Sequence, residues 1–148
     1  MTSLPSILTL AHLIGLALGI GCATVKLTLL LRCRGDAAQI PAYLAVARPV
    51  TRLLISGLAL LTLSGIGWLL YGYPFTQILV VKLFLVGAIW VLGPVIDNVA
   101  EPKFKELAPG PGEPASPEFI RIRRTYILLE IAATGLFYVI IVMWVLGN

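Results

Sequence analysis

Four apolar segments dominate this 148-residue chain, and each is long enough to cross a lipid bilayer. The hydrocarbon core is about 30 Å thick and an α-helix rises about 1.5 Å per residue, so a span needs about 20 apolar residues. Charged residues make up 12% of the chain, whereas an ordinary soluble domain has about 25%. We therefore predict an all-α integral membrane protein, a four-helix bundle that forms a single domain over residues 1–148. The predicted spans are 7–31, 53–71, 78–96 and 125–146.

The distribution of basic residues predicts the orientation of the bundle. Basic residues flank two loops, predicted over residues 32–52 and 97–124, and are lacking at both ends of the chain and in the turn at Gly72. Because short loops rich in Lys and Arg stay in the cytoplasm, we expect both termini on the outer side of the inner (cytoplasmic) membrane. Anionic lipid headgroups then account for the net charge of +4 without a nucleic acid. Within the first loop, residues 42–52 are expected to lie along the membrane interface.

Polar residues inside the spans recur at helical spacing, so each set lies on one face of its helix. The faces carry His12, Gly15, Gly19, Cys22 and Lys26 in the first span; Lys82, Val86, Ile89, Gly93 and Asp97 in the third; and Tyr126, Glu130, Ala133 and Phe137 in the fourth. Counting residues from the span ends places the polar side chains at two depths. The outer polar group is His12 and Lys82, and the inner polar group, near the cytoplasmic side, is Lys26, Asp97 and Glu130.

The inner polar group combines one base with two acids, which we expect to meet inside the bundle. Opposite charges that pair at membrane depth lower each other's cost of burial. One interpretation is structural: an ion pair of Lys26 with Asp97 or Glu130 fixes the register of the helices. The other interpretation is a proton path, although no further carboxylate lies toward the outer face in any span.

The outer polar group lacks a countercharge, because no carboxylate occurs at the depth of Lys82 in any span. A lone ammonium in hydrocarbon costs about 3 kcal/mol or more. Lys82 therefore either extends toward the outer headgroups or neutralises a bound anion, such as a haem propionate, a porphyrin carboxylate, a lipid phosphate or a partner subunit. His12 is the single histidine of the chain. It is either a packed, hydrogen-bonded group or a ligand to a metal or to haem iron.

Three stretches of the chain are similar to a known superfamily. They are Ala11-His12-Leu13-Ile14-Gly15 with Gly19-Ile20-Gly21 in the first span, Tyr71-Gly72-Tyr73-Pro74 leading to Val81-Lys82-Leu83, and the basic residues Arg121 and Arg124 before the last span. This order of features resembles the four-helix membrane superfamily of CopD-type copper-resistance domains and HemJ-type protoporphyrinogen oxidases. The resemblance implies haem or porphyrin binding in one branch, with His12 and Lys82 at matching positions, and copper handling in the other.

The chain also departs from both patterns. HemJ-type proteins carry Asn-Glu-Pro where this chain has Ile127-Leu128-Leu129 before Glu130, and CopD-type proteins show Trp-x-Gly-Gly where it has Gly19-Ile20-Gly21-Cys22. Copper is the poorer expectation of the two. Soft thioether ligands favour copper, and Met143 is the single methionine beyond the initiator.

Three functions are compatible with these observations. The first is a haem- or tetrapyrrole-associated membrane protein with a redox role, in which His12 is the axial ligand and Lys82 pairs with a porphyrin carboxylate. The second is a non-catalytic accessory or assembly subunit, in which Gly57, Gly65 and Gly67 pack against a membrane-protein partner or a second copy. The third, less favoured, is a small transporter. The sequence contains no recognisable phosphate-binding loop or Ser-His-Asp arrangement, which argues against the chemistry of common soluble enzymes, and whether the protein is an enzyme stays open.

Overall fold

The computed structural model describes residues 3–35, 37–110 and 113–146, and within these ranges it contains helices and no strands. The elements are α1 (Leu4–Gly35), the short turn η1 (Ala37–Gln39), α2 (Ile40–Leu70), α3 (Gln77–Val95), the π-helical turn η2 (Ile96–Ala100), α4 (Glu101–Glu106) and α5 (Pro117–Leu146). Four helical runs in this part of the chain are long and apolar enough to cross a membrane: Leu4–Gly35, Ala37–Leu70, Gln77–Glu106 and Pro117–Leu146. The predicted four-helix membrane bundle is thereby confirmed.

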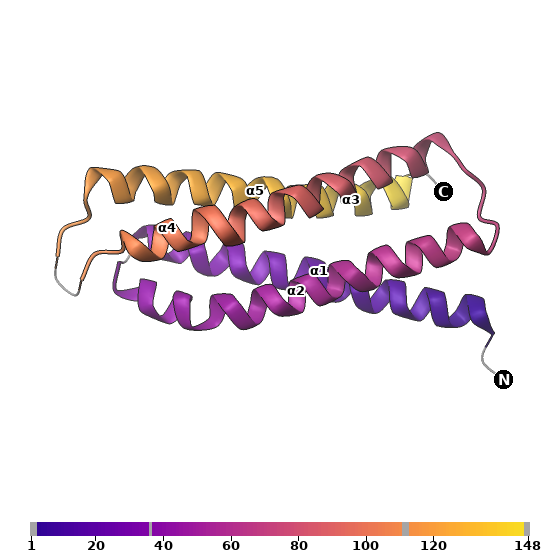
Figure 1. Ribbon diagram of the computed structural model, residues 1–148, viewed down its shortest axis with the longest axis horizontal. Coiled ribbons are helices and arrows are strands. Elements are labelled where there is room, and N and C mark those ends of the chain that lie inside the picture. The colour runs from indigo at the N-terminus through magenta and orange to yellow at the C-terminus, as the bar shows by residue number, and fades with distance from the viewer. Residues whose placement is uncertain (1–2, 36, 111–112, 147–148) are drawn as a thin grey trace.

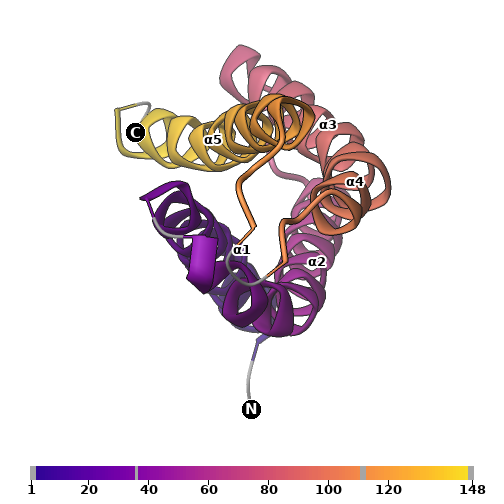
Figure 2. The ribbon, with the colours of Figure 1, turned by 90° about the vertical axis from the view of Figure 1, so that its left-hand side faces the viewer.

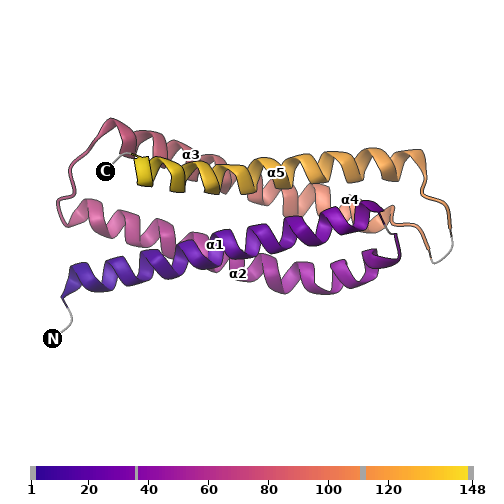
Figure 3. The same ribbon diagram turned by 180° about the vertical axis from the view of Figure 1, so that it is seen from behind.

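The four long helices form a ring in the order α1, α2, α3, α5 (Figure 2). Helix α1 packs most extensively on α2 and also on α5, and α3 packs mainly on α5, so α1 and α3 occupy opposite corners. The first residues of α1 and the last residues of α5 lie at the same end of the bundle as the turn between α2 and α3 (Figures 1 and 3). The predicted outward orientation of that end rests on the basic residues alone.

The helices extend well beyond the apolar spans predicted from the sequence. Residues 40–52 form the first turns of α2, and residues 97–106 and 117–124 are also helical for most of their length. The expectation that residues 42–52 lie along the membrane interface was wrong, since Tyr43 and Ala47 are buried inside the bundle. Hydropathy marks where the lipid core ends, whereas a helix continues as long as its backbone hydrogen bonds are satisfied.

Glycines bring α1 and α2 into direct backbone contact near the middle of the bundle. A Cβ atom added at Gly57 would lie 2.6 Å from the backbone nitrogen of Gly19 and 2.9 Å from the carbonyl oxygen of Gly15. Gly67 likewise lies against Leu8 of α1. The expectation that Gly57 and Gly67 face a partner helix was therefore wrong: small residues allow close approach, and here α1 of the same chain makes that approach.

Gly57→Ala is expected to lower the free energy of unfolding by about 1–3 kcal/mol, because the new methyl group overpacks a contact made by backbone atoms. Thermal unfolding in detergent, followed by circular dichroism, measures the change. Gly65→Ala on the same helix is the matched control, since a Cβ there meets no atom within 4 Å. Equal unfolding temperatures for the two variants would show that α1 and α2 are not packed this closely.

Candidate functional site

The inner polar group assembles around the ammonium of Lys26, which lies inside the bundle with 3% of its side chain exposed. Its Nζ atom is 3.1 Å from Asp97 Oδ1, 3.1 Å from Glu101 Oε2 and 3.0 Å from Glu130 Oε1. Both acids expected beside Lys26 are therefore close to it, and a third carboxylate, Glu101, joins them. We call these four residues the charged cluster.

Each member of the charged cluster is positioned by a different element. Lys26 extends from α1, and Glu130 comes from the neighbouring helix α5. Asp97 lies in the π-helical turn η2, and Glu101 begins α4 immediately after it. Pro94 precedes this turn inside α3, where its missing N–H removes one helical hydrogen bond. A π turn at such a point often marks a functional site, and here it contains one of the acids that face Lys26.

Two buried tyrosines extend the charged cluster by hydrogen bonds. The hydroxyl of Tyr126 donates to Glu101 Oε2 at 3.0 Å, and the hydroxyls of Tyr43 and Tyr126 bond to each other. Because the proton of Tyr126 is committed to Glu101, Tyr43 is the donor in the second bond. A carboxylate that accepts such a bond is stabilised in its ionised form.

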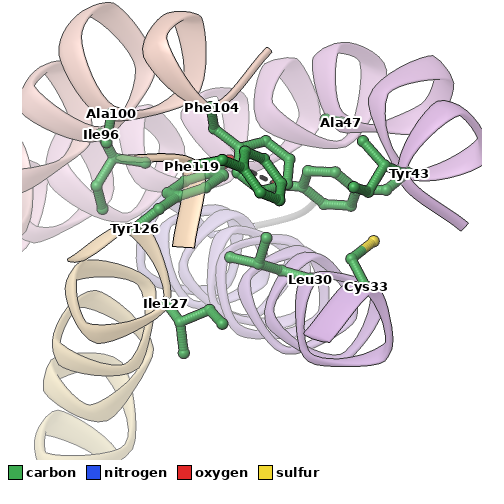
Figure 4. Packing of buried hydrophobic residues seen from close by; sticks show 11 residues of the cluster. Leu30, Cys33, Tyr43, Ala47, Ile96, Ala100, Phe104, Phe119, Tyr126 and Ile127 are labelled. Atoms are coloured by element: carbon green, nitrogen blue, oxygen red, sulfur yellow. Dashed lines mark hydrogen bonds between the residues drawn. The ribbon is translucent and has the colours of Figure 1, made fainter. Parts of the chain in front are cut away.

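Apolar layers enclose the charged cluster on both sides along the bundle axis. Toward the end that contains η1, the rings of Tyr43, Phe104, Phe119 and Tyr126 point toward one another (Figure 4), with Phe104 and Phe119 in contact at a centroid distance of 5.2 Å. Toward the opposite end, a second layer is formed by Ala23, Leu58, Ile89 and Phe137. Water therefore has little access to the cluster along the axis.

A small cavity of about 30 Å³ adjoins the charged cluster. It is lined by Lys26, Asp97 and Glu130 of the cluster, and also by Thr51 and Gly93. The hydroxyl oxygen of Thr51 is buried and has no hydrogen-bond partner among the described residues. Asp97 has 25% of its side chain exposed, so it links the cavity to the surface of the protein.

In the outer polar group, His12 contacts α2. Its Nδ1 atom lies 2.9 Å from the hydroxyl of Ser64, which itself donates to the carbonyl of Leu60 at 2.6 Å. Since the Ser64 proton is committed to that carbonyl, Nδ1 of His12 carries the hydrogen of their shared bond. The other ring nitrogen, Nε2, then presents a lone pair when the imidazole is neutral.

Lys82 lies on the face of α3 that carries Val86 and Ile89, and this face turns toward the bundle. Its side chain is half-buried, and all ion pairs in the described part of the chain are made by Lys26 instead. No hydrogen bond joins His12 to Lys82 within residues 3–35, 37–110 and 113–146. The structure thus brings the inner polar group into direct contact, whereas in the described part of the chain His12 and Lys82 make no hydrogen bond to each other, although the charge of Lys82 is near enough to act on His12.

No protein-family model, curated protein or solved structure matches the chain. The resemblance to CopD-type and HemJ-type proteins stays a hypothesis. Over the described residues, no group of three or more His, Cys, Asp or Glu side chains is arranged to hold a metal ion.

Glu101, Tyr43 and Thr51 contribute to the site but were not predicted from the sequence. Glu101 follows Asp97 by four residues and so shares its helical face. This spacing was overlooked because the predicted span ends at residue 96. Tyr43 and Thr51 both lie within the segment expected to be a loop, and helix α2 carries them into the bundle.

Proposed function

We propose that this protein is a proton-coupled membrane protein, and that its charged cluster binds and releases the coupling proton. The observation that carries the proposal is the imbalance of charge in the cluster. One ammonium faces three carboxylates, which gives a formal charge of −2 when every carboxylate is ionised. A buried excess of negative charge is costly, and binding a proton at one of the acids relieves part of it.

The same imbalance argues against a purely structural ion pair. A pair that only fixes helix register needs one acid for Lys26, and the two further acids add repulsion, since no other cation forms an ion pair with them among the residues that the structure describes. Because the three carboxylates share one cation, a proton on one of them reduces the repulsion among all three. The partial exposure of Asp97 gives the proton a route, and we propose, from the basic residues, that this route opens to the cytoplasmic side.

Infrared difference spectra between acidic and alkaline pH, recorded on the purified protein in lipid, test the proposal. We expect the wild type to show the C=O band of a weakly hydrogen-bonded carboxylic acid on acidification. The variant Asp97→Asn/Glu101→Gln/Glu130→Gln should lack this band. The matched control, Glu106→Gln/Glu113→Gln/Glu118→Gln, changes three exposed carboxylates and should keep it. A wild-type spectrum without the band would contradict proton coupling at the cluster.

A second candidate function is the association of His12 with haem or another tetrapyrrole. The bond from Nδ1 to Ser64 favours it, because ligating histidines commonly donate their other ring N–H to a neighbouring group. The cavity beside the charged cluster is far too small for a tetrapyrrole, whose pockets measure about 300 Å³ or more. The ligand would then lie against the outer surface beside His12, or between two copies of the chain.

If His12 ligates haem, the protein purified from cells supplied with haem precursors should show a Soret absorption band. His12→Ala should lose the band, because the axial nitrogen is removed, and Ser64→Ala should weaken or shift it. Absorption spectra of the three proteins, compared at equal concentration, measure this. A colourless wild type would exclude haem binding and would leave proton coupling, or an accessory role, as the explanation for the bundle.

A further inference from the structure

We propose that Glu130 is the carboxylate of the charged cluster that takes up the proton, and that water in the cavity beside Thr51 delivers it. This inference rests on the proposed function and names the residue and route at the same site. Its two parts depend on separate observations. The first is the unequal environment of the three acids, and the second is an orphaned hydroxyl that faces the cavity.

The three acids differ in how well their ionised forms are stabilised. Asp97 is partly exposed and accepts a hydrogen bond from Lys26 at 3.1 Å, and Glu101 accepts one from Tyr126. Glu130 is the most deeply buried of the three, with 4% of its side chain exposed against 25% for Asp97 and 16% for Glu101, and Lys26 Nζ lies 3.0 Å from its Oε1. Burial disfavours a carboxylate relative to its acid, and the penalty is largest where the least of the side chain reaches solvent. Of the three acids, Glu130 therefore gains most from a proton.

The cavity supplies a place for water next to Glu130. Its volume of about 30 Å³ has room for about two water molecules, since each needs roughly 10–15 Å³. Hydroxyls elsewhere in α2, such as those of Ser56 and Thr62, bond to the carbonyl four residues earlier. The Thr51 hydroxyl makes no such bond and lines the cavity instead. Buried polar atoms without a protein partner are usually satisfied by ordered water.

The transfer needs no further reactant. A hydronium ion beside Asp97 gives one proton to a water molecule in the cavity, so an O–H bond of the hydronium ion breaks and a new one forms on that water. The cavity water in turn gives a proton to Glu130, so one of its O–H bonds breaks and an O–H bond forms on the carboxylate. Glu130 changes from carboxylate to carboxylic acid, the charge of the cluster changes by one unit, and no electron moves. The charged or titratable groups that face Glu130 and modulate this step are Lys26 of α1, Asp97 of η2, Glu101 of α4, Tyr43 of α2 and Tyr126 of α5.

Single substitutions, measured by the same infrared difference spectroscopy, identify the acid. Glu130→Gln should lose the carboxylic C=O band, whereas Asp97→Asn and Glu101→Gln should keep it. Labelling the wild type with ¹³C-carboxyl glutamate should shift the band, and labelling with ¹³C-carboxyl aspartate should not, which identifies the residue type without any substitution. A band lost in Asp97→Asn or Glu101→Gln but kept in Glu130→Gln overturns the assignment and leaves the proposed function standing. A wild type without the band overturns both.

Two cavity variants test the water route. Thr51→Val removes the hydroxyl with little change in volume, and Gly93→Ala adds an unobstructed methyl group to a residue that lines the cavity. Both should lose the O–H stretching band of weakly bonded water in spectra recorded in H₂O and H₂¹⁸O. Gly87→Ala, six residues earlier on α3, is also unobstructed but does not line the cavity, so it is the control and should keep the band. Retention of the water band in both cavity variants, with helical content unchanged, overturns the route.

Discussion

Lys26→Met is expected to lower the free energy of unfolding by about 3–5 kcal/mol, because it leaves three carboxylates in the bundle without their cation. Methionine keeps the unbranched stem, so the loss reports mainly the missing ammonium. The effect should grow as the pH is raised, since each remaining carboxylate must then be buried in its ionised form. Thermal unfolding in detergent at several pH values measures both the size of the loss and its dependence on pH.

Two further variants separate this charge effect from other causes. Lys103→Met removes an exposed cation from α4 and should change the stability by less than about 0.5 kcal/mol. The double variant Lys26→Met/Glu130→Gln should recover part of the loss, because one of the three facing carboxylates is gone. If Lys26→Met were as stable as the wild type at every pH, the ammonium would not hold the acids together.

Phe104→Ala is expected to destabilise the bundle by about 3–5 kcal/mol through the cavity it leaves between Tyr43, Phe119 and Tyr126. The loss should have a second consequence, since these rings form the layer between the charged cluster and the end of the bundle that contains η1. Water entering through the gap would hydrate Glu101 and Glu130. Backbone hydrogen exchange in residues 97–104 should accordingly become faster than in the wild type.

Phe84→Ala is the matched control, because Phe84 also lies on the third helical run but is 80% exposed. Its removal should alter the unfolding temperature little and leave hydrogen exchange near the charged cluster unchanged. Equal effects of Phe84→Ala and Phe104→Ala would mean that the aromatic layer neither packs tightly nor excludes water.

The number and the approximate positions of the spans could be predicted from the sequence, because lipid imposes a minimum apolar length that few other structures require. The ends of the helices could not be predicted in this way. Residues 40–52 contain two arginines and two prolines, which suggest a loop, yet Tyr43 and Ala47 are held in helix α2 by tertiary packing. Local composition does not report such packing, which depends on side chains from α4 and α5.

For the candidate site, helical spacing was sufficient to group Lys26, Asp97 and Glu130 by depth. Helical spacing was not sufficient to show which helices are neighbours, although the order of the helices in the ring decides which side chains can touch. His12 and Lys82 have similar depths, yet the hydrogen-bond partner of His12 is Ser64 of the neighbouring helix α2, which the sequence did not indicate. The side chain of Lys26 is long enough to reach acids on the opposite side of the bundle. The depth of a residue in the membrane does not predict such a contact.

The four residues of the charged cluster are distributed unequally between the two helical hairpins. The cation belongs to the first helical hairpin, α1 with α2, and all three acids belong to the second. During synthesis, Lys26 is therefore made well before the three acids that pair with it. The first hairpin must remain shielded, by the insertion machinery or by headgroups, until residues 97–130 follow. Assembly of the two hairpins is then driven by charge as well as by packing, and a chain truncated before Asp97 should be a substrate for membrane quality control.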